Sequence, residues 1–125
     1  MELNYDFVRK VLIECADSDH PQGPTDKEIR AFASNNNVNL NELAFTIDKL
    51  READFINGKV IYGGDGPYKI LIGNLTWDGN QYLNSIRSSS VWKKTKQKLI
   101  DNGITASFSV ITSLATAIAK QKLGL

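Results

Sequence analysis

The chain has 125 residues, of which 42% are hydrophobic and 23% are charged, and its formal net charge is +1. This composition excludes full disorder and a coiled coil, and the length is enough to bury a core without disulfides or a structural metal. The single cysteine, Cys15, cannot form an internal disulfide, which favours a reducing compartment. We therefore expect one globular domain.

Neither end of the sequence predicts export or membrane insertion. Residues 1–4 lack the basic and then apolar pattern of a signal peptide. An uncharged run near the C-terminus, residues 104–119, is shorter than the roughly 20 apolar residues that cross a bilayer. We expect a cytoplasmic protein without a membrane partner.

The small net charge conceals an uneven distribution along the chain. Residues 1–54 contain six basic and eleven acidic residues, a net charge of −5. Residues 55–125 contain nine basic and three acidic residues, a net charge of +6. This division bears on the choice of partner, because an acidic surface repels nucleic acid.

Two helices are predicted in the first 35 residues. Apolar residues recur at helical spacing from Asn4 to Ala16, and Cys15 lies on the buried side of this helix. A loop rich in proline and glycine, residues 17–24, ends the helix and contains His20, which we expect at the surface. Thr25 and Glu28 then match a capping box for a helix over residues 26–34.

A third helix is predicted to begin after Asn39, following a turn at residues 35–38 in which asparagine tolerates left-handed backbone. Its inward arc carries Leu40, Leu43, Ala44, Ile47 and Leu50. Its outward arc carries Asn41, Glu42, Phe45, Asp48, Lys49 and Glu52. We expect Asp54, just past the end of the helix, to adopt the left-handed conformation that usually selects glycine.

Two β-strands follow the third helix. The residue types predict strands over 59–62 and 68–72, divided by the glycine-rich turn at 63–67. Three helices followed by a hairpin are typical of a winged helix-turn-helix. The predicted fold class is therefore α+β, with a winged-helix core over residues 1–75.

Three more helices are predicted over residues 76–125, which we expect to pack on the winged-helix core. Thr76 caps the first of them, and Gly79 within it suggests a close approach of another backbone. Ser90 is predicted to cap a helix from Val91 to Asp101. A last helix is predicted from about Ala106 to Lys122.

Several motifs resemble a known family. The segment from Ile47 to Ile56 is similar to the end of many winged-helix recognition helices. More specific is the series Leu75-Thr76-Trp77-Asp78-Gly79, Tyr82-Leu83, Ile86-Arg87, Val91-Trp92-Lys93-Lys94-x-Lys96 and Lys122-Leu123-Gly124-Leu125. It resembles the YjcQ-like domain-of-unknown-function family of Gram-positive bacteria and phages. The resemblance implies a winged-helix fold with a helical extension, and transfers no functional residues.

The residues do not predict an enzyme. The sequence has no phosphate-binding loop before a helix, no nucleophile elbow and no cluster of His and Cys at ligand spacing. Asp17 and Asp19 lack the remaining ligands of an EF-hand. We therefore expect no catalytic residues, no cofactor and no metal site.

The candidate contact residues are one aromatic and seven lysines. Reading of DNA by the third helix is disfavoured, since its outward arc has one cation, Lys49, against three carboxylates. Phe45 on the same arc either packs within the chain or contacts a protein partner. Lys59 and Lys69 on the hairpin could contact phosphates. The lysines of the fifth helix either form a solvated face or bind nucleic acid, an acidic protein patch or the acidic half of a second copy: Lys93, Lys94, Lys96 and Lys98.

From these features we predict a non-enzymatic regulatory or protein-interaction module whose partner is another protein or a second copy of the chain. The alternative is a DNA-binding transcriptional regulator that uses the wing and the basic helix near residues 93–98.

Overall fold

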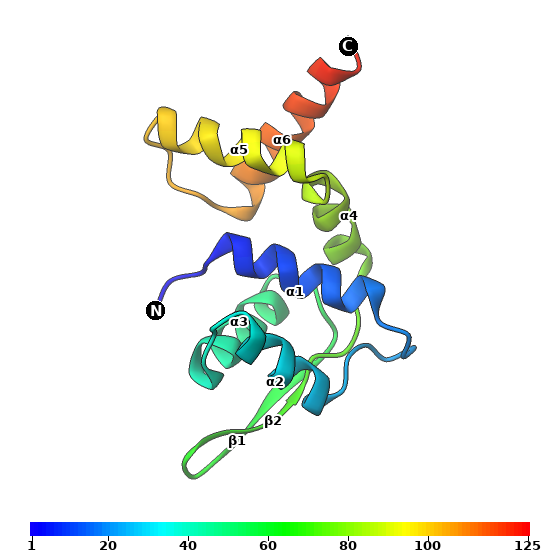
Figure 1. Cartoon of the computed structure of the whole chain (residues 1–125), viewed down its shortest axis with the longest axis vertical. Helices are drawn as coiled ribbons and strands as arrows, with labels where there is room; N and C mark the ends of the chain where they lie inside the picture. Colours follow the sequence, from blue (N-terminus) through cyan, green and yellow to red (C-terminus); the bar gives the residue numbers. More distant parts are fainter. The chain divides into compact units, whose positions relative to one another are not determined.

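The computed structural model describes all 125 residues and has six helices and one two-stranded antiparallel sheet (Figure 1). The elements are α1 (Tyr5–Asp17), α2 (Asp26–Asn35), α3 (Leu40–Glu52), β1 (Lys59–Gly63), β2 (Gly66–Leu71), α4 (Trp77–Ile86), α5 (Ser89–Asp101) and α6 (Phe108–Lys122). The α+β class is as predicted. The chain forms two compact units, Met1–Asn80 and Gln81–Leu125, and α4 runs across their boundary. The predicted division after residue 75 lies close to this boundary, and the packing of residues 76–125 on the core stays a prediction.

Local side-chain chemistry explains where the first three helices begin and end. Thr25 accepts a hydrogen bond from the Glu28 amide, and Glu28 accepts one from the Thr25 amide, which confirms the predicted capping box. Asn37 and Asp54 have φ angles of 58° and 60°, so both turns use the left-handed conformation. Each helix therefore ends where the sequence predicted it, to within a residue or two.

The core of the first unit lies between α1, α2, α3 and the hairpin. The Phe7 and Phe32 rings stack with centroids 6.0 Å apart, joining α1 to α2. The predicted inward arc of α3 is buried from Leu43 to Leu50. Fully buried side chains of this unit include Val8, Val11, Leu12, Ile29, Leu43, Ile47, Leu50, Ile56, Ile70 and Ile72.

The hairpin is held against α2 by side chains at the free edge of β2. Asp26 accepts a hydrogen bond from the Ile70 amide at 2.7 Å, and Arg30 donates one to the Tyr68 carbonyl at 2.8 Å. These two side chains occupy the edge that a third strand would otherwise pair with. The second strand was predicted over residues 68–72. In the structure β2 begins earlier, at Gly66, and ends at Leu71, so Ile72 lies outside it.

Gly79 confirms the predicted backbone approach. A Cβ atom at this position would lie 2.1 Å from the Phe55 carbonyl oxygen, which is closer than any real contact. The same carbonyl accepts a hydrogen bond from the Thr76 amide at 3.0 Å. The start of α4 is thus fixed to the loop that follows α3.

The second unit contains the end of α4 together with α5 and α6, which pack against each other. The Tyr82 and Phe108 rings meet edge to face, with centroids 4.9 Å apart. Two predicted helix starts were wrong: Ser88, not Ser90, caps α5, and α6 begins at Phe108 after the cap Ser107. No helix in the chain combines the length and apolar character that a membrane span requires.

Candidate functional site

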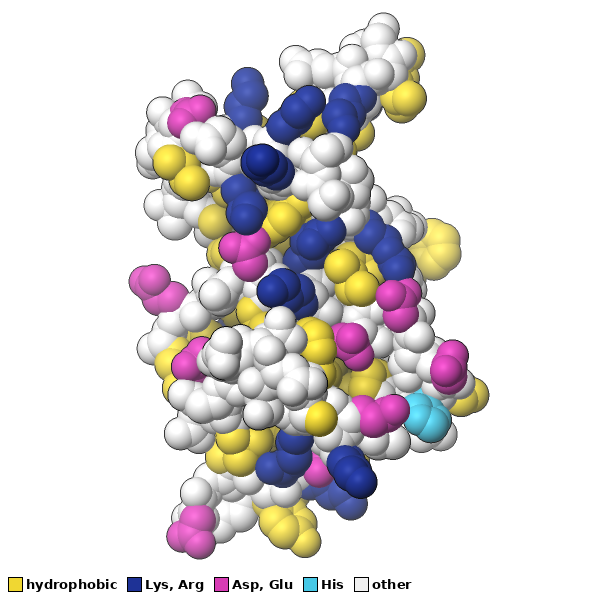
Figure 2. Space-filling model, in the orientation of Figure 1, with side chains coloured by type: hydrophobic (Ala, Val, Ile, Leu, Met, Phe, Trp, Pro, Cys, Tyr) yellow, Lys and Arg dark blue, Asp and Glu magenta, His cyan; other side chains and the backbone are white.

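The two units carry net charges of opposite sign. The first, Met1–Asn80, has eight basic and thirteen acidic residues, a net charge of −5. The second, Gln81–Leu125, has seven basic residues and one acidic residue, Asp101, a net charge of +6. Figure 2 shows Lys and Arg side chains gathered over α5 and α6 on the face that it draws. The charge division that the sequence predicted therefore follows a structural boundary.

The outward face of α3 satisfies most of its own polar groups. The Lys49 ammonium lies 2.9 Å from a Glu52 carboxylate oxygen and 5.6 Å from the centre of the half-buried Phe45 ring. Asp48 accepts a hydrogen bond from the Tyr62 hydroxyl, which raises the pKa of Tyr62 to about 12. The single cation of this arc is thus already paired with a carboxylate.

The face of the hairpin that points away from the core mixes cations with aliphatic side chains. Lys59 lies opposite Leu71, and Ile61 lies opposite Lys69, so the four side chains share one face. All four are exposed, whereas Ile70 on the other face is buried. We call these four residues, Lys59, Ile61, Lys69 and Leu71, the outer wing face.

An open groove of about 1240 Å³ lies at the base of the hairpin, and Lys27, Lys59 and Lys69 are among its lining residues. Asp26 also lines it, but its carboxylate is held by Arg30 at 2.9 Å and by the Ile70 amide. Partial burial would raise the pKa of Asp26, but these hydrogen bonds outweigh it and lower the pKa. The free charge in this groove is therefore positive.

The residue types that could form a nucleophile and base pair are unsuited to that role here. Cys15 is buried, and burial with the nearby Glu14 carboxylate raises the pKa of its thiol to about 12. His20 is exposed and lies 3.2 Å from Glu28. No group of three or more His, Cys, Asp or Glu residues is arranged to hold a metal ion.

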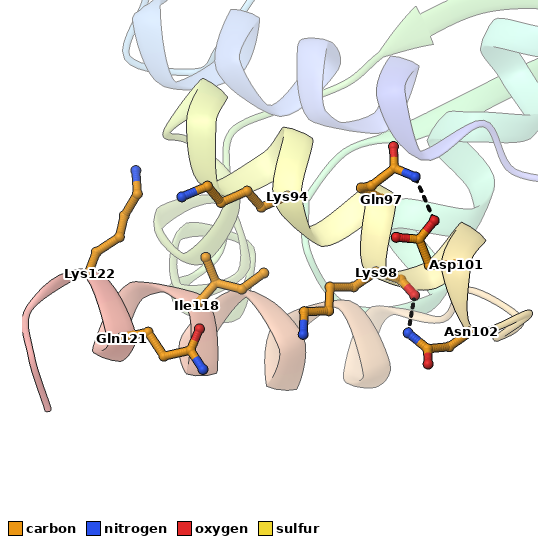
Figure 3. Close-up of a pocket in the computed structure, with 8 residues that line it drawn as sticks. All are labelled: Lys94, Gln97, Lys98, Asp101, Asn102, Ile118, Gln121 and Lys122. Atoms are coloured by element: carbon orange, nitrogen blue, oxygen red, sulfur yellow. Dashed lines mark hydrogen bonds between the residues drawn. The ribbon is translucent and has the colours of Figure 1, made fainter.

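A second groove, of about 520 Å³, lies between α5 and the C-terminal half of α6 (Figure 3). We call it the lysine groove. Ile118 and Asp101 line it together with three lysines and three side-chain amides. The lysines are Lys94, Lys98 and Lys122, and the amides are Gln97, Asn102 and Gln121. In Figure 3 the Lys94 and Lys122 side chains extend toward the same end of the groove.

Hydrogen bonds within the lysine groove leave two of its three cations, Lys94 and Lys98, without a partner in the chain. Gln97 donates to the Asp101 carboxylate at 2.7 Å, and Asn102 donates to the Lys98 carbonyl at 2.9 Å. Lys122 donates to the Ser90 hydroxyl. The ammonium groups of Lys94 and Lys98 form no ion pair or hydrogen bond within the chain.

The structure groups the predicted contact residues in three places. Phe45 and Lys49 lie together on α3, Lys59 and Lys69 lie on the outer wing face, and Lys94 and Lys98 line the lysine groove. Two lysines of α5 do not line this groove: Lys93 is exposed, and the Lys96 ammonium lies 5.7 Å from the Trp92 ring centre. Sequence reasoning missed Lys27 and Lys122, because no local pattern indicates which distant segment of the chain each one faces.

Comparison with known proteins extends over nearly the whole chain. A Haemophilus influenzae protein titled "Uncharacterized protein" is 23% identical over 124 residues, which cover 98% of this chain and 99% of that protein. No solved structure matches the chain. A family model described as "Hypothetical protein (DUF2513)" matches residues 2–105, a range that ends before α6. This match confirms a domain of unknown function but does not support the YjcQ-like identity that the sequence motifs predict: the chain belongs to the DUF2513 family.

Proposed function

We propose that this protein is a non-enzymatic winged-helix regulatory module that acts by binding a protein, and that this partner is a second copy of the chain. The observation that carries the proposal is the pairing of surfaces on the first unit. The outer wing face is cationic and aliphatic, whereas the outward face of α3 is anionic and contains Phe45. A second copy can present each surface to the other.

The winged-helix part of the proposal is supported by the order of the elements. Three helices precede an antiparallel hairpin, and a short turn with a left-handed Asn37 joins α2 to α3. The hairpin then packs on α2 and α3. The narrower resemblance to the YjcQ-like family of Gram-positive bacteria and phages stays a prediction, and the proposal does not depend on it.

The choice of a protein over DNA for this unit is supported by its exposed side chains. On the hairpin, Tyr68 is 72% exposed, and Tyr62, which donates a hydrogen bond to Asp48 of α3, is 54% exposed. Aromatic anchors of this kind are enriched in protein interfaces. Glu42 and Glu52 on α3 would be repelled by a phosphate backbone, but they complement lysines from another copy.

Sedimentation velocity tests the proposal. At low salt and up to about 100 μM protein, we expect a species of twice the 13.9 kDa chain mass, with a dissociation constant in the micromolar range. The double variant Lys59→Glu/Lys69→Glu should dissociate it. Adding Glu42→Lys/Glu52→Lys should restore the dimer, since the charges are then exchanged rather than removed. A monomer throughout this range would overturn the proposal.

A second candidate function is a DNA-binding transcriptional regulator that uses the wing and the basic helix near residues 93–98. The observation in its favour is that Lys93, Lys94 and Lys98 form no ion pair with a carboxylate of the chain. Such cations can neutralise phosphates without first breaking an ion pair within the chain. Retention on mixed duplex DNA at low salt would support this candidate.

A further inference from the structure

We propose that the lysine groove between α5 and α6 is a binding site for the sugar–phosphate backbone of duplex nucleic acid, read without regard to sequence. The inference rests on the second candidate function and moves its main contact from the wing to a site that includes the last turn of α6. It does not depend on the protein partner proposed for the first unit.

The geometry of the groove brings cations from two helices to one place. Lys94 and Lys98 are one helical turn apart on α5, and Lys122 comes from the end of α6. The single carboxylate of the second unit, Asp101, is at the end of α5 and accepts a hydrogen bond from Gln97. The groove therefore has three positive charges against one negative charge, within a unit of net charge +6.

The lining favours a phosphate ligand over a protein surface. Protein interfaces are enriched in aromatic and arginine anchors and depleted in lysine. This groove has no aromatic or arginine side chain, and Ile118 is its only aliphatic one. Lysine and side-chain amides are instead among the groups that contact phosphate and sugar oxygens in nucleic-acid complexes.

The same lining favours a duplex over a single strand. Proteins that bind single strands combine cations with exposed aromatic rings, on which the bases stack. The one aromatic residue of α5, Trp92, is 4% exposed and does not line the groove. Without a stacking platform, contacts to the backbone of a duplex remain, and these carry no sequence information.

The test is fluorescence anisotropy with a labelled mixed-sequence duplex at several salt concentrations from about 50 to 200 mM. The variant Lys94→Gln/Lys98→Gln/Lys122→Gln, the groove variant, should bind at least about tenfold more weakly at the lowest salt. The slope of log K against log salt is negative, and its magnitude should decrease by about 2.7, since each lost phosphate contact removes about 0.9. A thermal melt followed by circular dichroism checks that the variant is folded.

The matched control removes three exposed lysines that belong neither to the lysine groove nor to the outer wing face: Lys10→Gln/Lys27→Gln/Lys120→Gln. It changes the net charge by the same amount and should keep both affinity and slope near those of the natural chain. An equal loss of duplex affinity in both variants would contradict the proposed site, because binding would then follow net charge alone. A loss of affinity in the control only would also overturn it, because the phosphate contacts would then lie outside the groove.

Two further results would contradict the inference. If the natural chain does not bind duplex at the lowest salt, both the groove and the second candidate function fail, and the dimer proposal is judged separately by sedimentation. If a single strand binds more tightly than the duplex, or if poly-glutamate of equal charge displaces the duplex equally well, the groove does not recognise a duplex backbone.

Discussion

The two units of this chain build exposed surfaces from different side chains. In the first unit, the hairpin and α3 expose tyrosines, aliphatic residues and carboxylates, and the one cation on the outward arc of α3 is paired with Glu52. In the second unit, α5 and α6 expose lysines and amides with a single carboxylate. This contrast is the basis for our two proposals, a protein partner for the first surface and a polyanion for the second.

The difference also extends to how each candidate surface is supported. The hairpin that carries the outer wing face is positioned by contacts to its backbone. The Asp26 and Arg30 side chains bond to the backbone of β2, and the Phe55 carbonyl before β1 packs closely against Gly79. The lysine groove depends on two helices that pack through buried residues such as Leu99 and Ile118. Substitutions that disturb the first support should therefore be costly, whereas lysine substitutions in the groove should cost little stability.

The largest expected effect comes from the buried side of α3. Ile47 is fully buried, so Ile47→Ala should lower the free energy of unfolding by about 2–5 kcal/mol. The matched control is Ile100→Ala on α5, where the side chain is 72% exposed, with an expected change within about 0.5 kcal/mol. Urea denaturation measures both. Similar losses in the two variants would show that the buried and exposed assignments are wrong.

Asp26 should have the next largest effect. Asp26→Ala leaves the Ile70 amide and Arg30 without their acceptor, and we expect a loss of about 2–3 kcal/mol at neutral pH. Asp19→Ala in the exposed loop is the control, with little expected change.

The contribution of Asp26 should also depend on pH. Its pKa is lowered in the folded chain, so the stabilisation is fully present above the unfolded pKa of about 3.9. It is lost as the pH falls through the lower folded value. The difference in the free energy of unfolding between Asp26→Ala and the natural chain should therefore narrow below about pH 4, as measured by urea denaturation at several pH values. A difference that widens in acid would contradict the assignment.

A smaller effect is expected at Gly79. The added methyl group of Gly79→Ala would meet the Phe55 carbonyl, which costs about 1–3 kcal/mol, partly offset by the higher helix propensity of alanine. Gly64→Ala at the hairpin tip, where no atom lies within 4 Å, is the control. Thermal melts compare the two, and equal melting temperatures would exclude the close approach.

The smallest effect is expected at Tyr62. Its hydrogen bond to Asp48 is exposed, so Tyr62→Phe should change stability by no more than about 1 kcal/mol. The clearer measurement is spectrophotometric titration, in which one phenol should titrate near pH 12. Asp48→Asn should lower that pKa, because the charged acceptor is the main cause of the shift. A titration curve that Asp48→Asn leaves unchanged would contradict the contact.

Features decided within a few residues could be predicted from the sequence. The capping box at Thr25 and Glu28, the left-handed turns at Asn37 and Asp54 and the close approach at Gly79 are all local in cause. The cap of α5 was misplaced because three consecutive serines each offer the same hydroxyl, and tertiary packing decides among them.

Features that join distant parts of the chain could not be predicted. The bond from the Ile70 amide to Asp26 spans 44 residues, and no periodicity in either segment indicates it. The basic character of α5 was visible in the sequence, but the groove was not, because Lys122 meets Lys94 and Lys98 only through the packing of α5 and α6. The number of charged residues follows from the sequence, but which of their side chains lie together in space follows only from the tertiary structure.

The central claim is that the two surfaces act separately, and one measurement tests it directly: sedimentation velocity of the chain mixed with a labelled duplex at low salt. The groove variant should still form a dimer but should no longer sediment with the duplex. Lys59→Glu/Lys69→Glu should sediment with the duplex as a monomer. If either variant loses both properties, or if each loses the property assigned to the other surface, the claim is wrong.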